Sequence, residues 1–80
     1  MTKQKIIELL EKNGNRKDIC VQYADAYLEY QEATENIDKN GLIVQHPRTM
    51  NPIDNPYMGV RDRALKKLQA FRGIKSNGLW

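Results

Sequence analysis

Apolar residues recur at helical spacing in three separate stretches of the chain. The first runs from Thr2 to Asn13 and carries isoleucine and leucine on one face. Thr2 is a suitable N-cap, and Gly14 can end the helix in a left-handed conformation. Because a helix of about three turns is not stable alone, this stretch predicts a short helix that packs against another element.

The second stretch is the longest and predicts a helix from Asn15, a plausible N-cap, to Asn40, with Gly41 as its stop. Its apolar residues spread over an arc of roughly 240°, whereas one packing partner usually needs a stripe of only a little over ~100°. This helix is therefore expected to be covered from more than one side. Three carboxylates share the narrow strip that remains: Asp25, Glu29 and Glu32.

The third helical stretch follows an extended segment and a proline-containing loop. Residues 41–45 are rich in apolar and β-branched side chains, which favours an extended conformation, and the loop that follows has the composition of turns. Asn55 is a good N-cap, and Pro56 suits the first helical position. Helical spacing then continues to Arg72, and Gly73 is a natural stop.

Together these elements predict one mainly α domain. It consists of an N-terminal helix (1–14), a long antiparallel helical hairpin with a short extended or β excursion between its two long helices (15–72), and a flexible, aperiodic tail (73–80). A lone core in a chain of 80 residues supplies only ~3–5 kcal/mol, and the single cysteine, Cys20, excludes an internal disulfide. Oligomerisation is the remaining support, so the hairpin is expected to be an oligomerisation core.

The formal net charge of +3 hides a strong pattern along the chain. Residues 1–17 hold five Lys and Arg against two Asp and Glu, residues 18–55 hold two against seven, and residues 56–80 hold six against one. Basic ends around an acidic middle suit ion pairing between segments and contact of the ends with an anionic partner. No apolar run approaches the ~20 residues needed to span a bilayer, and the first residues lack a signal-peptide core. The chain is therefore expected to be soluble and intracellular, with no membrane partner.

Catalytic chemistry finds little support in the residue types. His46 stands before a proline in the loop, with no serine or cysteine nearby that suits a nucleophile. Cys20 occupies an apolar helical position without a neighbouring histidine or a CxxC spacing, which favours a buried structural thiol. The acidic strip is typical of a solvated face, and the glycines at helix ends do not form a phosphate-binding loop. We expect no enzyme activity, no metal site and no cofactor.

Tyrosines at helical spacing mark the second helix. They resemble a base-stacking surface, but the acidic helix that carries them repels phosphate. A core or a subunit interface is favoured, because a tyrosine ring can be buried while its hydroxyl finds a partner. The predicted oligomer-interface residues are Tyr23, Tyr27, Tyr30, Ile37, Leu65 and Leu68.

Lysine and arginine cluster around the first helix and the turn after it, and again on the last helix and the tail. A solvated face explains any one of them, but charges multiplied in an oligomer give salt-sensitive affinity for DNA by counterion release. The first helix and the start of the second form only a loose helix-turn-helix candidate. The predicted DNA-contacting residues are Lys3, Lys5, Lys12, Arg16, Lys17, Arg63, Lys66 and Lys67.

From Ile19 to Phe71 the chain resembles the small terminase subunits of tailed bacteriophages. The resemblance rests on the order and spacing of several features rather than on one motif. They are the tyrosine-bearing helix (residues 23–30), the stretch Gly41-Leu42-Ile43-Val44 after the helix end, the proline-containing loop, the helix start at Asn55-Pro56, and Gly73-Ile74-Lys75-Ser76 after the last helix.

This resemblance implies a cyclic homo-oligomer that recognises viral double-stranded DNA and delivers it to the large terminase subunit, whose ATPase and nuclease it regulates. Neighbours in the ring would cover the wide apolar arc of the second helix. Apart from the resemblance, the charge and exposure of the tail suggest the hypothesis that it docks the large subunit. The expected location is the cytoplasm of the infected or lysogenic bacterial host. Two alternatives stay open: a small helix-turn-helix DNA-binding regulator, and a protein-interaction module that binds no nucleic acid.

Overall fold

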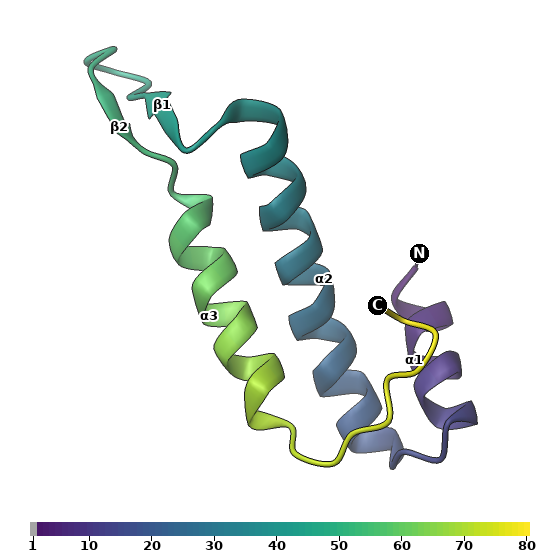
Figure 1. The fold of residues 1–80 in the computed structure, drawn as a ribbon. Helices are drawn as coiled ribbons and strands as arrows, with labels where there is room; N and C mark the ends of the chain where they lie inside the picture. The colour runs from purple at the N-terminus through teal and green to yellow at the C-terminus, as the bar shows by residue number, and fades with distance from the viewer. Residues whose placement is uncertain (1) are drawn as a thin grey trace.

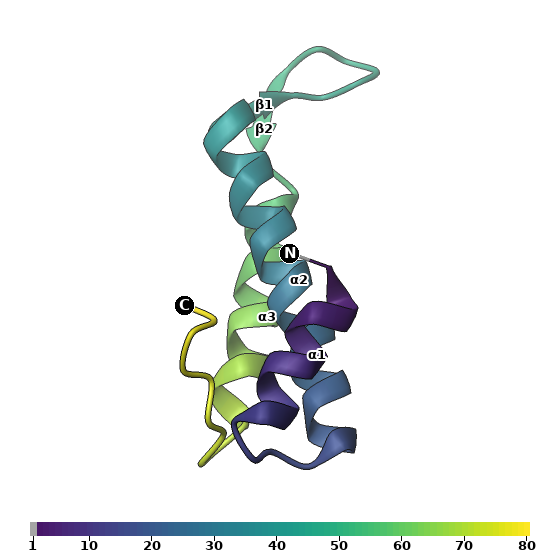
Figure 2. The same cartoon turned by 90° about the vertical axis from the view of Figure 1, so that its right-hand side faces the viewer.

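A computed structural model describes residues 2–80 as three helices and a two-stranded antiparallel sheet. α2 and α3 lie side by side in opposite directions, and the strands close the end of this pair (Figure 1). α1 and the C-terminal tail pack at the other end, on different sides of α2 (Figure 2). The predicted mainly α fold with a β excursion is confirmed. The elements are α1 (Lys3–Lys12), α2 (Lys17–Asn40), β1 (Ile43–Gln45), β2 (Pro52–Asp54) and α3 (Tyr57–Ala70).

Local capping chemistry explains where the first helix begins and where α1 and α2 end. The Thr2 hydroxyl accepts a hydrogen bond from the backbone N–H of Lys5 (3.3 Å), as expected for an N-cap. Gly14 and Gly41 follow the two helices with φ of +96° and +88°, a region that glycine enters without steric cost. Both predicted helix ends are therefore confirmed.

The predicted N-cap of α2 is wrong by one residue. Arg16, not Asn15, occupies the N-cap position. The Asn15 side chain instead donates to the carbonyl oxygens of Leu10 (2.8 Å) and Lys75 (2.7 Å), and its oxygen accepts from the Lys75 N–H (2.9 Å). Asn15 thus ties the α1–α2 turn to the tail, a contact 60 residues apart in sequence that no local pattern reveals.

The basal half of α2, residues 17–30, is covered on three sides by its own chain. α1, the tail and the end of α3 all contribute side chains to one apolar cluster around it. The prediction that this helix is covered from more than one side is confirmed, and the observed cover comes from the same chain. The buried members of this core are Ile6, Ile7, Leu10, Cys20, Tyr23, Ala24, Ala26, Tyr27, Leu68 and Leu79.

The distal half of α2, residues 31–40, packs mainly on α3. Ala33 and Ala64 are fully buried and Ile37 nearly so, so that small side chains separate the two helices. The molecule is correspondingly long, with extents of 49 × 22 × 17 Å. Its radius of gyration of 15.2 Å exceeds the ~11.6 Å typical of a compact chain of this length. This half of the hairpin has little core of its own.

Asn55 joins the distal end of α2, the β-hairpin formed by β1 and β2, and α3. Its side-chain amide donates to Asn36 Oδ1 (3.0 Å) and to the Gly41 carbonyl oxygen (2.9 Å), and its Oδ1 accepts from the Tyr57 N–H (2.9 Å). The residue is polar and yet only 2% exposed, so these bonds satisfy its buried amide. Asn55 Oδ1 thus bonds to the first N–H of α3, but the predicted N-cap is wrong by one residue, because Pro56 occupies that position and α3 begins at Tyr57.

Residues 73–80, expected to form a flexible tail, pack back on the α1–α2 corner. The Asn13 side-chain amide donates to the carbonyl oxygens of Asn77 (2.9 Å) and Lys75 (3.3 Å). Together with the bonds of Asn15, these contacts fix the backbone of the tail at several points. The sequence lacks periodicity here because the tail is held by side chains from elsewhere rather than by its own helix.

The last two residues close over the tyrosines of α2. Leu79 is buried, and its carbonyl oxygen accepts a hydrogen bond from the Tyr27 hydroxyl (3.1 Å). The Trp80 indole N–H donates to the Tyr23 hydroxyl (3.0 Å). Its ring stands edge-on to the rings of Tyr27 and Tyr30, with centroids 4.8 and 5.7 Å apart. These geometries are favourable for aromatic pairs, so the tail contributes to the core.

Candidate nucleic-acid and subunit interfaces

The acidic strip of α2 is flanked by lysines from the two neighbouring helices. Lys3 of α1 pairs with Asp25 (Nζ–Oδ1, 2.8 Å), and Lys67 of α3 pairs with Glu29 (Nζ–Oε2, 3.4 Å). All four side chains are about half exposed, so each pair contributes at most ~1 kcal/mol. The attraction expected between the acidic strip and the basic face of the last helix therefore operates within the protomer. Two predicted DNA-contacting lysines already have anionic partners.

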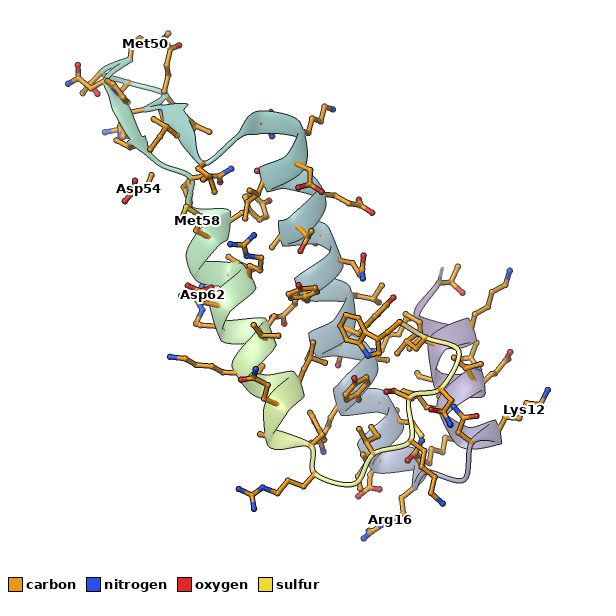
Figure 3. The ribbon with its side chains drawn as sticks, viewed as in Figure 1. Lys12, Arg16, Met50, Asp54, Met58 and Asp62 are labelled. Carbon is orange, nitrogen blue, oxygen red and sulfur yellow. The ribbon has the colours of Figure 1, made fainter. Side chains whose placement is uncertain are left out.

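Three other predicted DNA-contacting residues gather with two further cations at the α1–α2 turn. Lys75 Nζ lies 3.9 Å from the position that a Cβ would occupy on Gly14. The end of α3 also lies close to this turn, because Asn15 and Arg72 line the same hollow of about 390 Å³. Figure 3 shows Lys12 and Arg16 pointing away from the helices at this end. We call this surface the basic end: Lys12, Arg16, Lys17, Arg72 and Lys75.

The electrostatics of the basic end favour an anion. All five side chains are exposed, and α2 begins here, so its first backbone N–H groups add partial positive charge. Arg16 has a carboxylate partner in Asp18 at 3.3 Å, but both are well exposed and solvent screens the pair. Arg72 and Lys75 were not among the predicted DNA-contacting residues, because only the folded tail carries them to the α1–α2 turn.

The remaining predicted DNA-contacting residues are exposed elsewhere. Lys5 shares the outer face of α1 with Lys12, two turns away. Arg63 and Lys66 lie on the side of α3 opposite its buried residues. The eight candidates therefore do not form one surface: three belong to the basic end, two flank the acidic strip, and three are dispersed.

Most of the predicted oligomer-interface residues are buried inside the protomer. Tyr23, Tyr27, Ile37 and Leu68 belong to this group, so their apolar surface is already in use. Two candidates keep free surface: Tyr30, which is partly covered by Trp80, and Leu65, which is 37% exposed. The contacts Phe71–Tyr23 and Lys67–Glu29 set the alignment of α2 and α3 and place Leu65 level with Tyr30. The other exposed large apolar residues are Leu42, Ile43, Met50 and Trp80.

The open face of α2 argues against a helix-turn-helix reader. A recognition helix presents its first turns to the major groove. Here α1, α3 and the tail cover three sides of the basal half, and the open side carries Gln22, Asp25 and Glu29. Carboxylates on that side repel phosphate, so α2 is poorly suited to enter a DNA groove.

The residues weighed for catalysis have structural roles. Cys20 is fully buried, as predicted, and burial raises the pKa of its thiol, with the Glu11 carboxylate as a second cause. His46 Nδ1 accepts hydrogen bonds from the backbone N–H groups of Arg48 (3.1 Å) and Thr49 (3.3 Å), which stabilises the turn. Within residues 2–80, His, Cys, Asp and Glu form no group of three that suits a metal ion.

Over the same described part of the chain, no helix combines the length and the apolar character needed to cross a membrane. The observed surface instead carries polar and charged side chains on all three helices.

The fold and its charged surface define a small helical-hairpin protein whose cations gather at the α1–α2 turn. A family model described as phage terminase, small subunit, matches residues 4–73, and the chain belongs to this family. The match includes α1, which lies outside the stretch on which the sequence resemblance rests, and it stops where the packed tail begins. Neither a curated protein nor a solved structure was found that matches the chain.

Proposed function

We propose that this terminase small subunit binds viral double-stranded DNA through the basic end and assembles into a ring that presents several copies of this surface. The observation that carries the DNA contact is the convergence of five cations from three segments at the start of α2. Each phosphate neutralised releases counterions, so copies of a modest site around a ring add up to useful affinity. In this role the chain regulates the large ATPase and nuclease subunit in the cytoplasm of the bacterial host and performs no catalysis itself.

Two triple variants with the same loss of charge test the DNA contact. The first removes the three predicted members of the basic end, and the second removes the three dispersed cations. Binding to duplex DNA is measured by fluorescence anisotropy over a range of salt concentrations. The variants are Lys12→Ala/Arg16→Ala/Lys17→Ala and Lys5→Ala/Arg63→Ala/Lys66→Ala.

We expect the basic-end variant to lose most of its affinity at low salt. The slope of log K against log salt should fall by up to ~2.7, because each lost phosphate contact removes ~0.9. The variant that lacks the three dispersed cations should keep most of its affinity and most of its salt slope. Equal losses in the two variants would mean that net charge, rather than the basic end, governs binding.

Ring assembly is supported by the elongated shape, by the thin core of the distal half and by the free surface at Leu65 and Tyr30. A charge at Leu65 should therefore disrupt assembly. We expect Leu65→Glu to lower the mass measured by size-exclusion chromatography with light scattering. Gln69→Glu, which adds the same charge at an exposed position of α3, should leave the mass unchanged. A wild-type chain that remains monomeric at micromolar concentration would exclude the ring.

A further inference from the structure

The β-hairpin at the distal end of the molecule has a defined hydrogen-bond register. The Asn55 N–H donates to the Leu42 carbonyl oxygen (2.7 Å), and the His46 N–H donates to the Asn51 carbonyl oxygen (2.9 Å). These bonds join the residue pairs that lie immediately before and immediately after the three pairs of the β1–β2 ladder. In an antiparallel ladder, hydrogen-bonded and non-hydrogen-bonded pairs alternate. The residues next to these pairs on each strand therefore direct their backbone groups away from the partner strand.

On β1 the outward residues are Ile43 and Gln45, and on β2 they are Pro52 and Asp54. The two edges differ in their ability to accept another strand. Pro52 has no N–H to donate, and Asp54 places a charge on the edge; both devices protect natural edge strands from pairing. The β1 edge has neither device, since its two outward residues can each donate and accept.

The surroundings of β1 leave its edge accessible. The hairpin extends beyond the ends of α2 and α3 (Figures 1 and 2). A hollow of about 570 Å³ lies where the β-hairpin meets the helix ends, lined by residues of both strands together with Asn40 of α2 and Tyr57 of α3. Ile43 is 57% exposed and Leu42 is 54% exposed, so apolar side chains line this end of the molecule.

We propose that the β1 edge pairs with the β1 edge of a second copy of the chain, in an antiparallel, two-fold arrangement. The register is self-complementary: Ile43 of one copy lies opposite Gln45 of the other, and Val44 faces its own equivalent. Each of the two outer pairs exchanges two N–H···O bonds, which gives four hydrogen bonds in all. Pairing of β1 with the β2 edge would lose one of these at Pro52.

The charge and the length of β1 are compatible with a second copy of β1 as its partner. Residues 42–45 contain no charged side chain, so two copies of β1 approach without repulsion. Strands of three residues bury far less than the ~1,200–2,000 Å² of a standard stable interface. The contact is therefore weak and concentration-dependent alone, and it is effective where another interface already holds copies together. It requires neither a ring nor DNA, so it stands or falls separately from the proposed function.

Edge prolines with amide hydrogen exchange test the pairing. Gln45→Pro removes an outward N–H of β1, and Asp54→Pro removes an outward N–H of β2 as its matched control. Both substitutions spare the hydrogen bonds between β1 and β2, because the N–H groups that they remove point outward. Circular dichroism and the exchange of the inward Val44 amide check that the hairpin remains folded.

For the wild-type chain we expect the exchange of the Ile43 and Gln45 amides to slow by roughly tenfold or more between dilute and concentrated samples. Gln45→Pro should abolish this protection at Ile43, and Asp54→Pro should retain it. Leu65→Glu should retain it as well, which separates this contact from ring assembly. Exchange that is independent of concentration would overturn the proposal, and so would equal loss of protection in both proline variants.

Discussion

Replacing Asn55 by alanine should destabilise the whole helical hairpin. The side chain is 2% exposed and makes three hydrogen bonds, to Asn36, Gly41 and the N–H of Tyr57. At a net ~1 kcal/mol for each bond, the loss in free energy of unfolding is about 3 kcal/mol. A core of this size supplies only ~3–5 kcal/mol, so the substitution should remove most of the stability of the isolated protomer.

An isosteric substitution separates the donor and acceptor roles of Asn55. Asn55→Asp keeps an oxygen to accept from Tyr57, but it turns both donated bonds into contacts between a carboxylate and oxygens of Asn36 and Gly41. Because a buried charge that faces acceptors costs more than a missing donor, Asn55→Asp should be at least as destabilising at pH 7 as Asn55→Ala. The control is Asn51→Ala, at an exposed turn position, where a change within ~0.5 kcal/mol is expected.

Urea unfolding followed by circular dichroism measures these differences. All variants are compared at one protein concentration, because the proposed self-association would make stability depend on concentration. A loss below ~1 kcal/mol for Asn55→Ala would refute the estimate. An aspartate variant more stable than the alanine variant would show that capping of α3, rather than donation to α2 and the hairpin, is the main role of this side chain.

Two further predictions concern the basal half. Tyr27→Phe removes the hydrogen bond to the Leu79 carbonyl oxygen and should lower the free energy of unfolding, measured in urea, by about 1–2 kcal/mol. The control Tyr57→Phe, remote from the tail, should lower it little. Equal losses in the two variants would contradict the role given to the tail. Burial raises the pKa of the Cys20 thiol above its ordinary value of 9.0, so the unfolded thiol ionises at lower pH than the folded one. The stability linked to Cys20 is then fully present below pH 9.0 and is lost as the pH rises through the raised pKa. Cys20→Ala should flatten this alkaline decline, and labelling of the wild-type thiol by a disulfide reagent at pH 7 should be no faster than unfolding.

The helices were predictable because their signals are local. Thr2 caps α1, Gly14 and Gly41 follow the helix ends, and helical periodicity sets the buried faces. β2 was harder to predict, since Pro52 and Asp54 are both uncommon in strands. The strand forms because its neighbour β1 pairs with it and because Asn55 fixes the end of the hairpin.

The position of the tail, and the identity of the segments that cover α2, could not be predicted from periodicity. Leu79 and Trp80 find their places only when Tyr23 and Tyr27 are presented by the folded α2. The wide apolar arc of α2 correctly indicated several covering partners. A helical pattern states how much surface must be covered, but it does not distinguish cover by the same chain from cover by a neighbour. The basic end was likewise predicted only in part, because Arg72 and Lys75 reach it through tertiary packing.

The unequal support along α2 has a mechanical consequence. Near its start the helix packs against three neighbouring segments, whereas toward Asn40 it packs mainly against α3 on one side. Bending stiffness rises steeply with thickness, so deformation concentrates in the thinner part. We therefore expect the distal half of the helical hairpin to bend relative to the basal half, while the surface that carries Lys12 and Arg16 keeps its shape.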